Sequence, residues 1–325
     1  MISVYTSGSD HLVTGGPEVL TGDPLWIDLL RPTPEEEAAV EDLVGADVPT
    51  REEMQEIEVS SRLSRRGDTL VMTSPILTNS SGFNPSNAAV TFIVVGHRLV
   101  TVRYDTPQAI DIFVAGLPKR APRPASHGDV LLGLVEAVVD RMADVLERIG
   151  NELDGISHRI FHQAMPSRPR RRTSSREMEV TLRTIGRNGD LSSKARETIL
   201  GIRRMVGFLP VDETALGVHD ARGRLKTIGR DLQSLSEYAD FLNNKIAFLL
   251  DATLGMINIQ QNHIIKLFSV MAVLFLPPTL VASWYGMNFR LMPELEWAWG
   301  YPMALGMALL AAVLPYWIFK RKGWL

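Results

Sequence analysis

Two long apolar runs near the carboxyl-terminal end constrain the fold of this chain more than any other feature. The first, residues 264–285, carries one charge, Lys266, close to its start, and the second, residues 299–319, carries none. The uncharged part of the first run, 267–285, would measure roughly 29 Å as a helix, close to the thickness of the hydrocarbon layer of a membrane. We therefore expect two transmembrane helices.

The alternative is a pair of buried helices in the core of a soluble protein. Pro277 and Pro278 fall in the first run, and Pro315 falls in the second. Proline weakens a helix in a soluble protein, whereas neighbouring helices in a membrane satisfy the backbone groups that it frees. The prolines therefore favour membrane helices.

The charges beside the two runs predict their orientation. A basic tail, 320–325, follows the second run and contains Lys320, Arg321 and Lys322. The short loop between the runs, 286–298, has one base and two acids, Arg290, Glu294 and Glu296. Because positive charge accumulates on the cytoplasmic side of a membrane, we expect both termini inside and the loop outside.

Composition excludes several classes of function. The chain has 325 residues and a net charge of −3, from 34 basic and 37 acidic residues, which argues against a nucleic-acid partner. It has no cysteine, so disulfides, thiolate metal sites and cysteine catalysis are excluded. Residues 1–10 lack a basic and an apolar region, so no cleaved signal is expected. No phosphate-binding, zinc-protease or hydrolase motif is present, and we expect neither an enzyme nor an organic cofactor.

The part before the first run is long enough for a soluble domain with its own core. Residues 1–120 have the pattern of a mixed α/β domain, with helices expected at 34–44 and 50–57. Gly96-His97 is typical of a two-residue hairpin turn. Strands are expected at 2–5, 26–30, 69–77, 89–95 and 98–104.

Residues 125–209 are strongly helical in pattern and predict two long helices, 129–165 and 177–209, packed as an antiparallel hairpin. The tip of this hairpin is basic, with Arg168 and Arg170-Arg171-Arg172. We hypothesise that the tip contacts anionic lipid headgroups.

A third helix is expected over the stalk, 211–263, and continues without interruption into the first apolar run. Its apolar residues alternate at spacings of three and four, as in helices packed in coiled-coil fashion. These residues are Leu225, Ile228, Leu232, Leu235, Ala239, Leu242, Ile246 and Leu249.

One face of this third helix carries a stripe that is polar at its start and apolar within the membrane. Its members are Asp251, Asn258, Asn262, Ile265, Ser269, Ala272, Leu276 and Thr279, which share a face because their spacings are three, four or seven. An asparagine at such a place is often only a contact between helices. Because this stripe stays in register and ends below Gly286-Met287-Asn288, we interpret it as a pore lining.

A single helix cannot enclose a pore, so the stripe implies a homo-oligomer that turns this face toward its axis. Rings of Ile265 and Leu276 would then gate the pore by constriction and dewetting. A ring of Asp251 would repel itself unless a cation lay between the carboxylates, which suggests sensing of intracellular ions.

The tripeptide Gly286-Met287-Asn288 suits a hydrated divalent cation. Mg²⁺ gives up water reluctantly, and a ring of neutral Asn288 oxygens would accept hydrogen bonds from its water shell without holding the ion too tightly. Gly286 would allow a turn forbidden to other residues, and Met287 would pack to fix the loop. The alternative is a helix C-cap. Glu294 and Glu296 would attract cations to the entrance, or would simply be solvated.

The region around the two runs also carries a family resemblance. It lies in Tyr285-Gly286-Met287-Asn288-Phe289, Met292-Pro293-Glu294-Leu295, Trp297, Gly300-Tyr301-Pro302 and the tail 320–325. These residues resemble the CorA-type magnesium transport family. The resemblance implies an α+β cytoplasmic domain followed by a helical stalk and two transmembrane helices, 264–285 and 299–319. It further implies a funnel-shaped homopentamer in a bacterial inner membrane.

By this resemblance the chain would pass Mg²⁺, and often Co²⁺ and Ni²⁺, inward down the electrochemical gradient. The family's filter falls on Gly286, Met287 and Asn288, and its pore-lining positions fall on Asn262 and Thr279. The acidic ring falls on Asp251, and we assign Tyr285 to the outer end of the pore lining. Lys320, Arg321 and Lys322 would form a basic cytoplasmic ring. Members of the family also bind regulatory Mg²⁺ between subunits, and here the candidates are Asp231, Glu237 and Asp240.

Two other functions remain as alternatives. The first is a transporter of Zn²⁺ or another transition metal, for which His219 and His263 are candidate residues. The chain after Asn288 lacks the Val-Gly-Gly of the zinc-transporting branch, which favours Mg²⁺. The second is a membrane-anchored signalling or scaffold protein whose coiled coil binds partners. That function would require no ion flux.

Overall fold

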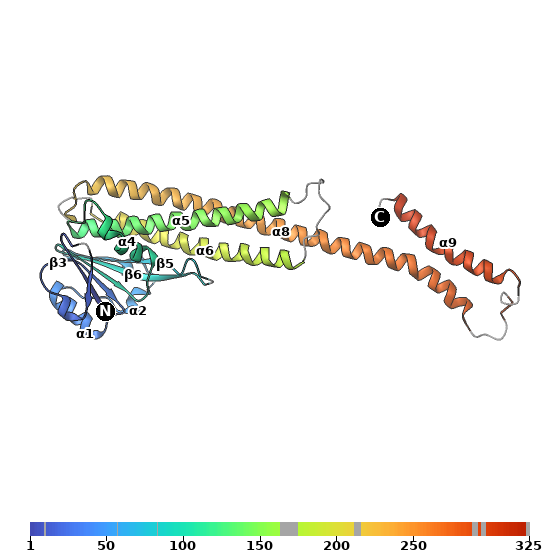
Figure 1. Cartoon of the computed structure of the whole chain (residues 1–325), viewed down its shortest axis with the longest axis horizontal. Helices are drawn as coiled ribbons and strands as arrows, with labels where there is room; N and C mark the ends of the chain where they lie inside the picture. Colours follow the sequence, from blue (N-terminus) through green and yellow to red (C-terminus); the bar gives the residue numbers. More distant parts are fainter. Residues whose placement is uncertain are drawn as a thin grey trace. The chain divides into compact units, whose positions relative to one another are not determined.

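The computed structural model describes residues 1–9, 11–56, 58–82, 84–162, 175–210, 216–287, 292–293 and 297–322 (Figure 1). The chain divides into two compact units, Met1–Leu250 and Asp251–Leu325.

The first unit contains a seven-stranded sheet in the order β2-β1-β3-β7-β6-β5-β4. Strands β3 and β7 pair in parallel, and the other neighbours are antiparallel. The strands are β1 (Ile2–Thr6), β2 (Val13–Gly15), β3 (Pro24–Leu30), β4 (Leu63–Arg66), β5 (Thr69–Thr78), β6 (Ser86–Val95) and β7 (Arg98–Arg103). All five predicted strands are therefore confirmed.

The β6–β7 hairpin confirms the turn predicted at Gly96-His97. Val95 pairs with Arg98 across the turn, so two residues form the connection. Gly96 has a φ of 56°, in the left-handed region that glycine enters without steric cost. The turn thereby fixes the register of the two central strands.

Helices cover both faces of the sheet, which makes three layers. Helices α1 (Pro34–Val44) and α2 (Arg51–Met54) lie on one face, and α4 (Gln108–Gly116), α5 (His127–His162) and α6 (Ser175–Phe208) lie on the other (Figure 1). Because side chains alternate along a strand, each face has its own buried apolar cluster. The α1 side is filled by Ile2, Val4, Ile27, Leu29, Val40, Met54, Ile93, Val100 and Val102.

The helices on the α1 side begin at capping boxes. The Thr33 hydroxyl accepts a hydrogen bond from the Glu36 amide, and the Glu36 carboxylate accepts one from the Thr33 amide. The helix predicted at 34–44 is confirmed to the residue. The helix predicted at 50–57 is shorter than expected, because α2 ends at Met54 and Ile57 lies outside the described residues. The remaining short elements are α3 (Val59–Arg62) and two 3-10 turns, η1 (Pro17–Val19) and η2 (Leu117–Lys119).

The two long helices α5 and α6 run antiparallel, as predicted. Arg187 of α6 forms an ion pair of 3.3 Å with Glu152, in the second half of α5. At the other end, Gly128 of α5 lies against the backbone of Leu216, beyond the end of α6. The basic tip, Arg168 and Arg170-Arg171-Arg172, lies outside the described residues.

Helix α8 (Ala221–Tyr285) begins in the first unit, where it packs on α5 and α6. Ion pairs join it to both helices: Arg224 to Asp129 of α5 at 3.1 Å, and Asp240 to Arg196 of α6 at 2.9 Å. The predicted coiled-coil face is confirmed. Its buried members are Leu225, Ile228, Leu232, Ala239, Leu242 and Leu249, with Leu235 and Ile246 partly buried against them.

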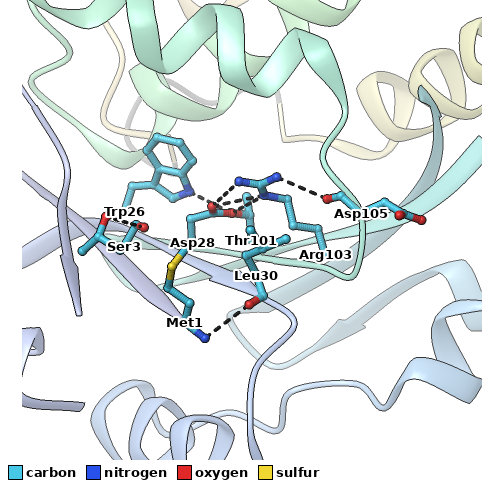
Figure 2. Close-up of polar contacts among 9 residues, drawn as sticks. Met1, Ser3, Trp26, Asp28, Leu30, Thr101, Arg103 and Asp105 are labelled. Atoms are coloured by element: carbon cyan, nitrogen blue, oxygen red, sulfur yellow. Dashed lines mark hydrogen bonds and ion pairs between the residues drawn. The ribbon is translucent and has the colours of Figure 1, made fainter. Parts of the chain in front are cut away.

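An ion pair is buried between the two parallel strands. The Arg103 guanidinium donates to both oxygens of Asp28 at 2.9–3.1 Å, and the Thr101 hydroxyl donates to the same carboxylate at 2.6 Å (Figure 2). Trp26 donates to the Thr101 oxygen, and the Arg103 side chain also reaches the Asp105 carbonyl. The side chains of Asp28 and Arg103 are only 3% and 7% exposed. Each charge therefore depends on the other for most of its polar contacts.

We expect the substitution Asp28→Ala to destabilise the first unit by about 3–5 kcal/mol, because it leaves the buried Arg103 charge unpaired. The midpoint of urea unfolding, followed by circular dichroism, measures this effect. Asp68→Ala, at the exposed turn between β4 and β5, is the control and should shift the stability by less than about 0.5 kcal/mol. Equal midpoints for the two variants would show that the buried pair contributes nothing.

The second unit contains the rest of α8 and helix α9 (Gly300–Arg321). Both helices have a segment long and apolar enough to cross a membrane, and neither segment is buried. Pro277 and Pro278 lie inside α8, and Pro315 lies inside α9, without ending either helix. The prediction of a helix that continues from the stalk through the first apolar run is confirmed by the bounds of α8. The predicted start at residue 211 is wrong, because Gly217 and Asp220 adopt left-handed conformations, with φ of 61° and 59°, and α8 begins only at Ala221.

Candidate ion pathway along helix α8

The eight residues of the predicted stripe are all exposed on α8. They are Asp251, Asn258, Asn262, Ile265, Ser269, Ala272, Leu276 and Thr279. The exposed fraction is 62% for Ile265 and 67% for Leu276, which is high for apolar side chains. An exposed apolar residue in the membrane segment contacts either lipid or another chain, so exposure alone does not distinguish a pore from a lipid-facing surface.

Another face of the same segment is half-buried. Its members are Val270, Val273, Leu274, Pro277, Pro278, Val281 and Tyr285. Tyr285 therefore differs from the rest of the predicted pore lining. At about 100° per residue it lies about 120° around the helix from Thr279. Tyr285 is on the half-buried face in the single chain, at the last residue of α8.

Part of the stripe lines a shallow groove. The residues along it are Ala272, Phe275, Leu276, Thr279, Leu280 and Ser283. Ser283 is exposed and continues the stripe four residues beyond Thr279. Ser283 was not among the predicted residues of the stripe, although it continues the same spacing of three and four.

Two hydroxyl groups of the stripe donate hydrogen bonds to backbone carbonyl groups of α8. Ser269 donates to the Ile265 carbonyl at 2.9 Å, and Thr279 donates to the Phe275 carbonyl at 2.6 Å. A hydroxyl whose proton is engaged in this way keeps its oxygen lone pairs as acceptors. Water molecules around a cation present their hydrogens outward. These two positions therefore have the polarity that a hydrated cation needs.

The turn after α8 differs from the sequence prediction at Gly286. Its φ is not in the left-handed region, and its amide donates to the Ala282 carbonyl at 2.9 Å, one more bond of the helical pattern. The expected glycine-only turn at this residue is therefore wrong. A larger side chain at this position is disfavoured by the space available instead, because a Cβ atom would lie 3.1 Å from the Ala282 carbonyl oxygen.

The described residues include only some of the predicted filter and entrance. The Met287 side chain is 43% exposed, directly after Gly286. Asn288, Glu294 and Glu296 lie outside the described residues. At the far end of α9, the Arg321 guanidinium stacks on the Trp317 ring at 3.9 Å, and the basic residues Lys320 and Lys322 are exposed.

The candidate regulatory acids do not converge in one chain. Asp240 pairs with Arg196, Glu237 accepts a hydrogen bond from Gln233, and Asp231 is exposed. Among the described residues, no three His, Cys, Asp or Glu side chains are grouped to hold a metal ion, and this includes His219 and His263. Arg224, on the same part of α8, pairs with Asp129 and Glu136 of α5.

The sequence matches the family described as "CorA-like Mg2+ transporter protein" over residues 22–321. A protein of Pasteurella multocida named "Magnesium transport protein CorA" is 36% identical over 301 residues, which cover 93% of this chain and 92% of the relative. The protein of that name from Escherichia coli K12 is 35% identical over 314 residues, 95% of each chain. The predicted resemblance is confirmed by these matches.

The fold is shared with a solved structure described as the complete structure of the CorA magnesium transporter from Methanocaldococcus jannaschii. The TM-score is 0.72 with 17% identity, and the match covers 100% of this chain and 98% of the other. The common parts are the α/β domain, the long helix and the carboxyl-terminal helix. At 17% identity, this likeness shows a shared fold alone.

Proposed function

Because this chain belongs to the CorA-like Mg²⁺ transporter family, we propose that it transports Mg²⁺ across a membrane. The observation that carries the proposal is the stripe of α8. Its hydroxyl groups at Ser269 and Thr279 lie on an exposed face within a largely apolar segment, with their oxygens able to accept hydrogen bonds. Polar groups inside a membrane are costly and mark ion pathways.

The pathway requires several copies of the chain. One exposed stripe on one helix provides a single wall, and a closed symmetric ring of identical chains provides the others. We propose a homo-oligomer, a pentamer as the family resemblance implies, with the stripe turned to the axis. In that arrangement the exposed Ile265 side chains face one another rather than lipid, as do those of Leu276, and the two rings exclude water when the pore is closed.

The remaining assignments extend the same proposal. Residues 1–263 would lie in the cytoplasm of a bacterial cell as the α/β domain (1–120), the helix hairpin (125–209) and the stalk (211–263). Helices at 264–285 and 299–319 would cross the inner membrane, with the loop 286–298 outside. Asn288 would select the hydrated ion, and Co²⁺ and Ni²⁺ would share the route. Regulatory Mg²⁺ at Asp231, Glu237 or Asp240 would need acids from a neighbouring copy, because one chain does not bring them together.

Flux through the purified protein tests the proposal. The protein is placed in liposomes with an Mg²⁺-sensitive dye inside, and Mg²⁺, Co²⁺ or Zn²⁺ is added outside. We expect Mg²⁺ uptake that stops when the inside already holds millimolar Mg²⁺, without ATP. Uptake of Zn²⁺ alone would favour the transition-metal alternative, and the absence of any flux would favour a scaffold protein.

A further inference from the structure

A small cavity lies in the first unit, far along the chain from the stripe. It has a volume of about 170 Å³ and is lined by the β5–β6 loop and by α5 and α6. The loop contributes Ser80, Ser81, Gly82 and Pro85, and the helices contribute Arg148, Glu152, Arg187 and Leu191. Three separate segments therefore build one site.

The loop is shaped by its own hydrogen bonds. Asn79 adopts a left-handed conformation with a φ of 50°, and the Gly82 amide donates to the Asn79 carbonyl at 2.9 Å. The Asn79 side-chain amide also donates to the Asn84 carbonyl at 3.0 Å. This tight turn presents Ser80 and Ser81 to the helices.

Two arginines of α5 meet at the same loop residue. Arg141 and Arg148 are seven residues apart and share a face of the helix. Arg148 donates to the Ser80 carbonyl at 2.5 Å, and Arg141 donates to the Ser80 hydroxyl at 2.7 Å. Their proximity and the burial of Arg141 lower the pKa of the Arg141 guanidinium from its ordinary value, burial being the larger cause.

The positive charge here exceeds the negative charge. Glu152 is engaged by Arg187 at 3.3 Å and by the Asn188 amide at 3.0 Å. Among the described residues no carboxylate lies within ion-pair distance of Arg148, and the nearest to Arg141 is the exposed Asp144 at 4.0 Å. The Arg141 Nε is buried and has no partner within the same described part of the chain. Two guanidinium groups therefore hold donors in excess over acceptors.

We propose that this cavity binds a phosphate group, held by Arg148 and Arg187 with the hydroxyl groups of the Ser80-Ser81 turn. Arginine presents a planar fork of donors that matches the oxygens of phosphate. Among the described residues Arg148 has no carboxylate partner, and an anion in the cavity supplies one. The ligand would join the sheet to α5 and α6, at a site separate from the ion pathway.

The size of the cavity defines the ligand class. Pockets for whole organic ligands usually exceed about 300 Å³, whereas this one is smaller and is lined by both polar and apolar groups. It therefore accommodates a single phosphate group, either as inorganic phosphate or as the terminal group of a phosphate monoester whose remaining part stays in solvent.

Isothermal titration of the full-length protein in detergent, in 150 mM KCl, tests the site with inorganic phosphate and with ribose 5-phosphate. We expect either ligand to bind, and the tighter of the two identifies the source of the phosphate. In Arg148→Gln we expect affinity to fall at least about tenfold, since a hydrogen bond to a charged group is lost. Arg203→Gln, at an exposed arginine of α6, is the matched control and should bind as the wild type does.

A second variant and a folding measurement keep the test decisive. Arg187→Gln removes the other arginine that lines the cavity and should weaken binding in the same way. Circular dichroism and retained Mg²⁺ uptake establish that each variant is folded. The proposal is overturned if neither ligand binds the wild-type protein at concentrations on the order of 10 mM. It is equally overturned if folded Arg148→Gln and Arg187→Gln proteins bind as tightly as Arg203→Gln.

Discussion

Leu276→Gly is expected to leave the pathway open when the cytoplasmic side already contains Mg²⁺. Leu276 is 67% exposed in the single chain and lies on the stripe between Ala272 and Thr279. In a ring of identical chains its side chains would form an apolar constriction that excludes water. Burying one leucine contributes about 1.5–3 kcal/mol, so removal from every subunit should raise leak at least about tenfold.

The measurement is Mg²⁺ flux into liposomes preloaded with millimolar Mg²⁺. Glycine also weakens a helix by about 1 kcal/mol, which is a separate effect. Leu309→Gly carries the same penalty at a position of α9 that is 60% exposed, and it should stay as tightly closed as the wild type. If Leu276→Gly closes as tightly as this control, Leu276 is not a gate.

Asn288→Ala is expected to reduce Mg²⁺ uptake to the level of protein-free liposomes. Asn288 lies outside the described residues, and the prediction rests on its place in the Gly286-Met287-Asn288 motif directly after α8. Its amide oxygen would accept hydrogen bonds from the water shell of Mg²⁺, and alanine offers no acceptor. Without that ring, the hydrated ion has no polar partner at the outer mouth.

Two controls separate selection from assembly. Size-exclusion chromatography should show the same oligomer for Asn288→Ala as for the wild type. Asn288→Asp keeps an acceptor but adds a charge, so it should bind the ion more tightly and release it more slowly, with uptake reduced but present. Wild-type uptake by an intact Asn288→Ala oligomer would remove Asn288 from the filter.

Local patterns predicted most of the sheet and the long helices. Thr33 and Glu36 form the capping box that starts α1. The stalk residues that recur at spacings of three and four pack against α5 and α6. Strand β4 was missed because Leu63-Ser64-Arg65-Arg66 has too few apolar residues, and its pairing with β5 decides its conformation. Helix α4 was missed because it lacks a strong start signal: its N-cap residue, Pro107, makes no side-chain capping hydrogen bond.

Long-range features were not predictable from single segments. The ion pair between Asp28 and Arg103 depends on the parallel pairing of β3 with β7, which no local pattern reports. The cavity at Arg148 and Arg187 likewise requires the β5–β6 loop to lie against two helices. A signal was present in the spacing of Arg141 and Arg148, which places two bases on one face of a largely buried helix. At Gly286 the motif was recognised, but the backbone conformation was not.

A cysteine at Ala272 tests the pore lining directly, because the chain contains no other cysteine. Ala272 is exposed in the middle of the stripe, and Val281 on the half-buried face of α8 serves as the matched position. We predict that a positively charged thiol reagent blocks Mg²⁺ uptake by Ala272→Cys protein and leaves Val281→Cys protein active. Complete labelling of Ala272→Cys with undiminished uptake would contradict an ion pathway along this face.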